Sequence, residues 1–148
     1  MQLTTHFTLE ELIASQNASR LGIDNYPGVA QIQNLKYLAE SLELVRDLLG
    51  HPIHVSSGFR SVELNANPAV GGQKTSAHMD GLAADIECHA FGTPLEICRA
   101  IAASEIPFDQ IIREFDSWCH FAIPHKGLIG RRDLLTIDKA GTRQGLGD

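Results

Sequence analysis

The chain has 148 residues and a formal charge of −6, and its hydrophobic and charged fractions are 43% and 20%. This length predicts a single domain over residues 1–148 with one core. The acidic balance argues against a dedicated nucleic-acid-binding protein, because such proteins usually have a basic surface. The apolar runs are too short to cross a bilayer, so we expect no membrane insertion.

The first part of the chain predicts two helices separated by a loop. Thr8 and Glu11 have the spacing of a capping box, which predicts a short helix over residues 8–15. Residues 22–28 contain glycine, asparagine and proline, and they predict a loop. Apolar side chains recur at helical spacing over residues 31–49, and a glycine follows where a helix C-cap glycine belongs. We expect this second helix to be the long helix of the core.

The second part of the chain predicts mostly short strands. The predicted strands are residues 53–57, 82–86, 110–115 and 118–123, with an edge strand at 134–137. A helical turn is predicted at 61–67, and a helix from Thr93 to about Ser104 begins with a second capping box. Because helices come first and strands follow, the pattern predicts an α+β fold: a small antiparallel sheet with flanking helices. The glycine-rich residues 139–148 predict a frayed, flexible tail.

The three cysteines, Cys88, Cys98 and Cys119, do not suggest a disulfide framework. Their number is odd and no CxxC spacing occurs. We therefore expect buried free thiols, which suit a reducing compartment.

Two potential metal ligands, His78 and Asp85, lie seven positions apart. Gly81 between them permits a bend, and the other intervening residues include small apolar ones that permit close packing. Asp85 falls in a predicted core strand, where an ionised carboxylate is unfavourable unless it is paired or binds a metal. A turn cap or an arginine partner for Asp85 is the alternative, and the residues alone leave both open.

A third ligand should come from another element, and His120 is the best candidate. It lies in an apolar strand and alternates onto the same face as Trp118. The alternative is a hydrogen-bonded core histidine. Two histidines and one carboxylate leave a coordination position for water, which is the usual composition of a catalytic zinc site.

These residues carry a family resemblance. Ser76-x-His78-x6-Asp85, followed by Trp118-x-His120, resembles the family of zinc D-alanyl-D-alanine carboxypeptidases and L-alanyl-D-glutamate peptidases. These are bacterial and phage cell-wall peptidases that share a fold with the hedgehog signalling domain. The SSGFRS segment at residues 56–61 also resembles a motif of this family, and further positions resemble its small phage-type branch. The resemblance covers roughly residues 5 to 125.

The resemblance implies a role for each matching residue. His78, Asp85 and His120 correspond to the three zinc ligands. Arg60 corresponds to an arginine near the metal that faces a substrate carbonyl or carboxylate, and a structural salt bridge is the alternative role for it. Trp118 is expected to contact the substrate, and Ser76 is expected to contact either the substrate or the groups that support the metal ligands.

The general base is less directly implied. The family often has an acidic residue three positions before the last zinc histidine, and here that position is Ser117. Glu114 and Asp116 are the nearby carboxylates. A Glu-Phe pair is common in the phage-type branch, and strand alternation places Glu114 on the face of His120 if the strand is regular. We therefore favour Glu114 over Asp116 as the general base.

The resemblance implies hydrolysis of peptidoglycan stem peptides by a water molecule that Zn²⁺ activates, as a D-Ala-D-Ala carboxypeptidase or an endopeptidase. The alternative is a non-catalytic zinc-containing module that binds cell-wall peptide or a protein partner. The N-terminus has no charged region followed by an apolar stretch, so we expect no secretory signal and a chain that is cytoplasmic as synthesised. A phage or prophage enzyme that a separate membrane-permeabilising protein releases to the cell wall fits this expectation.

Overall fold

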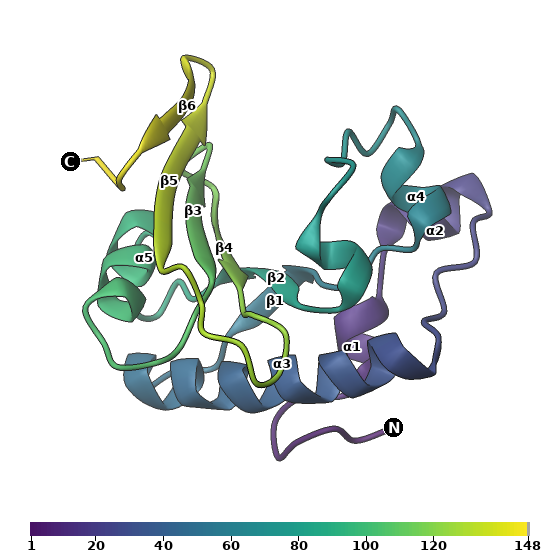
Figure 1. Ribbon diagram of the computed structural model, residues 1–148, viewed down its shortest axis with the longest axis horizontal. Coiled ribbons are helices and arrows are strands. Elements are labelled where there is room, and N and C mark those ends of the chain that lie inside the picture. The colour runs from purple at the N-terminus through teal and green to yellow at the C-terminus, as the bar shows by residue number, and fades with distance from the viewer. Residues whose placement is uncertain (148) are drawn as a thin grey trace.

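The computed structural model describes residues 1–147, in which helices surround one twisted sheet (Figure 1). The helices are α1 (Leu9–Ile13), α2 (Gln16–Leu21), α3 (Val29–Leu49), α4 (Val62–Ala66), α5 (Pro94–Ala102) and the 3₁₀ helix η1 (Ala77–Asp80). The strands are β1 (His54–Ser57), β2 (Ala83–Glu87), β3 (Gln110–Glu114), β4 (Trp118–Ala122), β5 (Asp133–Asp138) and β6 (Gly141–Gln144). The predicted α+β class is confirmed.

The long helix α3 lies along the bottom of the molecule in Figure 1 and supplies much of the core. Its buried apolar residues recur at helical spacing: Leu35, Leu38, Leu42, Val45 and Leu49. Gly50 ends the helix in the left-handed conformation at φ 73°. The helix begins two residues earlier than the periodicity predicts, and it packs against α1, α5 and η1.

The short helix predicted over residues 8–15 is α1, which ends at Ile13, and a second helix that was not predicted from the sequence, α2, follows it. Thr8 caps α1 by accepting a hydrogen bond from the Glu11 amide at 3.1 Å. The chain then becomes extended at Ala14, and Ser15 caps α2 by accepting from the Ala18 amide at 3.1 Å. Because a serine side chain competes for backbone amides, Ser15 starts a new helix instead of ending the first one.

The sheet has the strand order β1-β2-β4-β3-β5-β6. Its pairings are antiparallel as predicted, except that β3 and β5 are parallel. Because Ala122 at the end of β4 pairs with Gln110 at the start of β3, the chain leaving β4 is already at the end of the sheet where β3 begins. It passes that end and enters β5 at Asp133, beside Gln110.

The C-terminal segment differs from the predicted tail. The predicted strand at 134–137 is internal, because β6 pairs with β5 and takes the edge position. Leu146 is buried, and its carbonyl oxygen accepts a hydrogen bond from Arg113 Nη1 at 3.0 Å. The Gly147 carbonyl accepts from Arg99 Nη2 at 2.9 Å. Residues 139–147 are therefore docked on the domain, while Asp148 lies outside the described residues.

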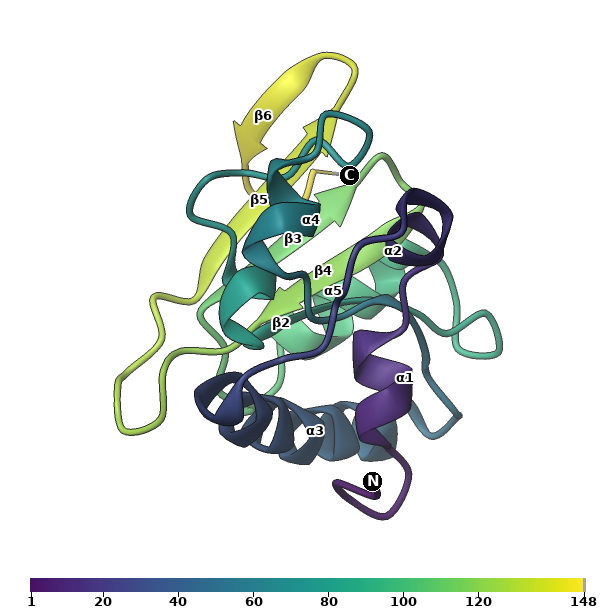
Figure 2. The ribbon, with the colours of Figure 1, turned by 90° about the vertical axis from the view of Figure 1, so that its right-hand side faces the viewer.

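The two faces of the sheet have different surroundings. Helix α5 packs on β3 and β4 from one side, where Cys119 and Phe121 are fully buried in the main core. The segment from α4 to η1 lies on the other side of the sheet (Figures 1 and 2). All three cysteines are buried free thiols, as predicted. Among the residues described, no helix has the length and apolar character that a bilayer crossing requires.

Candidate active site

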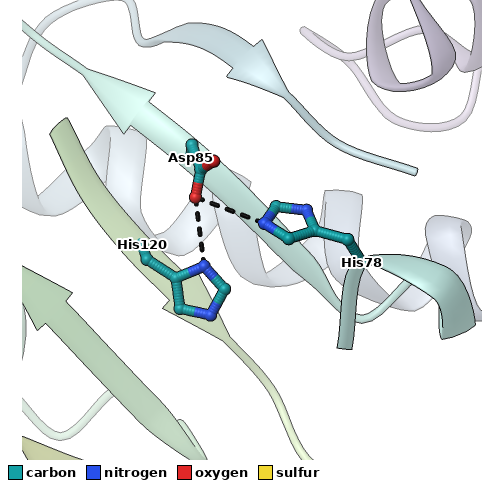
Figure 3. A group of neighbouring side chains, drawn as sticks. All are labelled: His78, Asp85 and His120. Atoms are coloured by element: carbon teal, nitrogen blue, oxygen red, sulfur yellow. Dashed lines mark hydrogen bonds and ion pairs between the residues drawn. The ribbon is translucent and has the colours of Figure 1, made fainter. Parts of the chain in front are cut away.

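His78, Asp85 and His120 come together on the open face of the sheet (Figure 3). Asp85 on β2 lies directly opposite His120 on the neighbouring strand β4. One carboxylate oxygen, Asp85 Oδ1, is 3.0 Å from His120 Nδ1 and 3.3 Å from His78 Nε2. All three side chains are buried, although they come from three different elements.

The short helix η1 sets the direction of His78. Ser76 Oγ accepts the His78 amide hydrogen at 3.2 Å and so caps the helix. Gly81 ends it at φ 75°, and a Cβ at this position would lie 2.9 Å from the Gln31 carbonyl oxygen of α3. Glycine is therefore required both by the backbone conformation and by the close approach of α3.

The Gly58 carbonyl fixes the tautomer of His78. It lies 2.7 Å from His78 Nδ1, and because a carbonyl oxygen only accepts, Nδ1 carries the hydrogen. In the neutral ring Nε2 then has a lone pair, and this lone pair faces Asp85 Oδ1. Two acceptors at such a distance repel each other unless a proton or a cation lies between them. The backbone acceptor thus holds His78 as metal-binding histidines are commonly held.

This donor set fits Zn²⁺. Two imidazole nitrogens and one carboxylate oxygen, all within 4.8 Å of one another, match the composition of catalytic zinc sites. Burial opposes ionisation of Asp85, but the positive charge and hydrogen bonds of His78 and His120 in their protonated forms outweigh it and hold the pKa of the Asp85 carboxyl well below its usual range. The carboxylate is therefore ionised at neutral pH, as a zinc ligand must be.

Glu114 lies beside this cluster at the end of β3. Its Oε1 is 3.9 Å from His120 Nδ1. Glu114 pairs with Trp118 and Ile112 pairs with His120, so the expected shared face of Glu114, Trp118 and His120 is present. Burial and the negative charge of Asp85 raise the pKa of Glu114, against the lowering effects of His120, Trp118 and Arg60. A carboxylate with a raised pKa binds a proton more readily near neutral pH.

Asp116 lies away from the cluster. Its side chain is 61% exposed, and its Oδ1 accepts a hydrogen bond from Arg113 Nε at 3.0 Å. Arg113 is on the opposite face of β3 from Glu114. Ser117, at the position where the family often has an acid, donates from Oγ to the Phe115 carbonyl at 3.0 Å. Of the two carboxylates that the sequence offered, only Glu114 reaches the histidines.

Arg60 lines the site next to the segment that carries Ser76 and His78, and its amide donates to the His78 carbonyl at 3.1 Å. Its Nη2 donates to Ser76 Oγ at 3.3 Å, and its Nε, which is buried, has no hydrogen-bond partner in the described part of the chain. Burial lowers the pKa of Arg60, while the charges of Asp85 and Glu114 raise it. Ser76 thus connects two features, since it caps the helix of His78 and accepts from Arg60. The guanidinium retains donors for a further acceptor.

The cluster opens into a cleft of about 850 Å³. The predicted site residues that line it are Arg60, Ser76, His78, Asp85, Glu114, Trp118 and His120. The cleft lining also includes the polar side chains of Asp80, Asp109, His125 and Arg131 and the exposed apolar side chains of Leu128 and Ile129. Beside Glu114 the cleft is lined by the large apolar side chains of Phe115, Trp118 and Ile137.

A protein-family model agrees with this site. The model described as Peptidase M15 matches residues 5–122, which is more than half of the chain and includes every residue of the cluster. The chain belongs to the peptidase M15 family. Members of this family are zinc-dependent peptidases, so the chain is a hydrolase of peptide bonds and Zn²⁺ is its cofactor. A comparison with curated proteins finds no match.

Two contributors to the site were not identified from the sequence. The Gly58 carbonyl orients His78, and a Cβ at Gly58 would lie 2.2 Å from the Leu12 carbonyl oxygen. Gly58 is part of the SSGFRS motif, but the motif did not indicate that its carbonyl orients His78. Ile137 lines the cleft from β5, outside the residues that the family model matches, and no sequence signal pointed to it.

Proposed function

We propose that this chain hydrolyses peptidoglycan stem peptides, as a D-Ala-D-Ala carboxypeptidase or an endopeptidase. The observation that carries the catalytic part is the position of Glu114, whose carboxylate is 3.9 Å from His120 beside a buried His-Asp-His group. The resemblance of the SSGFRS, Ser-x-His-x6-Asp and Trp-x-His segments to cell-wall peptidases supports the substrate class.

The metal ligands in this proposal are His78 through Nε2, Asp85 through a carboxylate oxygen and His120 through Nδ1. When bound by these residues, Zn²⁺ would act as a Lewis acid and would lower the pKa of a water molecule at the site to about 7. The protein contributes fixed orientations: Gly58 holds the ring of His78, and strand pairing holds Asp85 against His120.

Glu114 is the proposed general base. Its carboxylate accepts a proton from the attacking water, and its raised pKa favours this transfer near neutral pH. The resulting carboxylic acid then gives the proton to the amine that leaves when the peptide bond breaks. Glu114 is held on a strand rather than in a loop, which keeps the carboxylate at a constant distance from His120.

Arg60 is the proposed anion-binding residue. Its guanidinium, held by Ser76, presents fixed donors either to the negative charge that develops on the scissile carbonyl oxygen or to a terminal carboxylate of the substrate. An endopeptidase uses the first contact, and a carboxypeptidase also uses the second. Comparing a peptide that ends in a free carboxylate with its C-terminal amide distinguishes the two.

The test compares the wild type with Glu114→Gln, which keeps the shape of the side chain and removes the base. Release of D-alanine from stem peptides and cleavage of purified peptidoglycan are measured, with zinc content determined in parallel. We expect the variant to keep zinc and to lose activity by about a hundredfold or more. A zinc-loaded wild type without activity on any stem peptide would instead favour the non-catalytic module. That alternative is suggested by Ser117, which stands where the family often has an acidic residue.

The proposed substrate class also implies where the protein acts. Peptidoglycan lies outside the cytoplasmic membrane, so the chain must reach the cell wall. A phage or prophage origin with release by a separate membrane-permeabilising protein is the proposed route.

A further inference from the structure

Phe115 has a backbone conformation that a bulky side chain rarely adopts. Its φ is 51° and that of Asp116 is 52°, both in the left-handed region. The Ser117 amide donates to the Glu114 carbonyl at 2.9 Å and closes a tight turn between β3 and β4. Turns with two left-handed central residues favour glycine, asparagine and aspartate at these positions. Asp116 fits this preference, whereas Phe115 does not.

The neighbouring structure holds Phe115 in this conformation from several sides. Its amide donates to the Ile137 carbonyl of β5 at 2.7 Å, and its own carbonyl accepts from Ser117 Oγ at 3.0 Å. Packing of the ring in the core does not offset the strain, because the residue is 50% exposed and lies outside the main core cluster. Fold stability therefore does not explain a phenylalanine here, and strained residues held in this way are concentrated at functional sites.

Although it is half exposed, Phe115 lies at the cleft and its ring contacts another residue of the cleft lining. Phe115 lines the cleft together with Trp118 and Ile137. The ring centroids of Phe115 and Trp118 are 6.3 Å apart with an interplanar angle of 47°. Ile137 pairs with Glu114 across the parallel strands, so this apolar group directly flanks the proposed base. The rest of the cleft carries both charged side chains and the exposed apolar residues Leu128 and Ile129, so the group beside Glu114 is distinguished by its position next to the proposed base.

We infer that Phe115, with Trp118 and Ile137, forms a subsite for an apolar side chain on the substrate residue whose amine leaves. This inference rests on the proposed function. Glu114 must lie beside the leaving nitrogen when it returns the proton, so the residue that carries this nitrogen extends toward the group next to Glu114. An apolar side chain there covers the exposed ring of Phe115 and removes apolar surface from water.

The experiment uses the full-length, zinc-loaded protein and the substitution Phe115→Asn. Asparagine tolerates the left-handed conformation, so Tm should stay unchanged or rise by a few degrees. KM for a peptide with an apolar leaving residue should rise about tenfold, the size expected for loss of one aromatic contact. The variant should also lose the wild-type preference for an apolar over a serine leaving residue. Phe115→Tyr, which keeps the ring, should retain both the KM and the preference.

Phe91 offers a matched control, because it is another partly exposed phenylalanine and does not line the cleft. Phe91→Asn should leave KM and the preference at their wild-type values. If Phe115→Asn lowers Tm and keeps the KM and the preference, Phe115 has a structural role and the inference is overturned. If the wild type cleaves no peptide, the proposed function is overturned and the subsite with it; a cleaving wild type whose preference survives Phe115→Asn overturns the subsite alone.

Discussion

Asp85 and His120 lie directly opposite each other on adjacent antiparallel strands, with Asp85 Oδ1 3.0 Å from His120 Nδ1. This pairing fixes two of the three proposed ligands before any metal binds. The third, His78, meets the same oxygen from a short helix whose direction depends on glycines and on packing against α3. The backbone structure therefore sets the positions of the proposed ligands.

Asp85→Asn should weaken zinc binding at least about a hundredfold, because the charged ligand that both histidines face is lost. Zinc that binds only the folded protein raises its Tm, so the measurement is the zinc-induced rise in Tm together with the zinc content. Asp109→Asn is a matched control, since Asp109 lines the same cleft but pairs with Arg131 at 2.8 Å. Equal zinc retention by the two variants would exclude Asp85 as a ligand.

Gly81→Ala should destabilise the fold by about 2–4 kcal/mol, combining left-handed strain with overpacking against α3. The measurement is the free energy of unfolding in urea. Gly22→Ala isolates the first contribution, because Gly22 has φ 69° but nothing within 4 Å of an added Cβ. We expect Gly22→Ala to lose only about 1–2 kcal/mol. Equal losses at the two positions would show that the approach of α3 is unimportant.

Arg60→Lys should lower kcat/KM about a hundredfold while zinc content stays unchanged. Lysine keeps the positive charge but lacks the paired, planar donors of a guanidinium. Arg143→Lys is the control, since Arg143 pairs with Asp138 in the β5–β6 hairpin, at 2.7 Å, and does not line the cleft. Full activity of Arg60→Lys would contradict this prediction, because it would show that a positive charge at position 60 is sufficient.

The C-terminal hairpin gives a pH-dependent prediction. The hydrogen bond from Arg143 is the main cause that lowers the pKa of Asp138 from 3.8 to about 2. Because the pKa is lower in the folded state, the pair stabilises the hairpin fully above pH 4, and this contribution is lost as the pH falls from 4 through 2. Asp138→Asn should therefore reduce Tm at pH 6, and the difference from the wild type should shrink steadily as the pH is lowered to 2. The effect should be small because the pair is exposed.

Parts of the fold could be predicted because their signals are local. The apolar face of α3 and the capping residues Thr8 and Thr93 follow from helical geometry. The continuation of the chain after β4 could not be predicted in this way. β5 is parallel to β3 because β4 terminates at the end of the sheet where β3 begins. The tail is docked by Arg99 and Arg113, which lie far from it in the sequence.

The sequence by itself determined which residue types are available for the site. The donor atoms of His78, Asp85 and His120 stand out in apolar surroundings and made them candidate ligands, and the resemblance of the His-x6-Asp and Trp-x-His segments to a zinc peptidase family implied the set. Only the tertiary structure shows which of Glu114 and Asp116 lies beside His120. Strand register, a long-range property, places Glu114 on the same face as His120, whereas Asp116 lies in the turn and pairs with Arg113. The same turn holds Phe115 at the cleft, where composition gives no sign of its strained conformation.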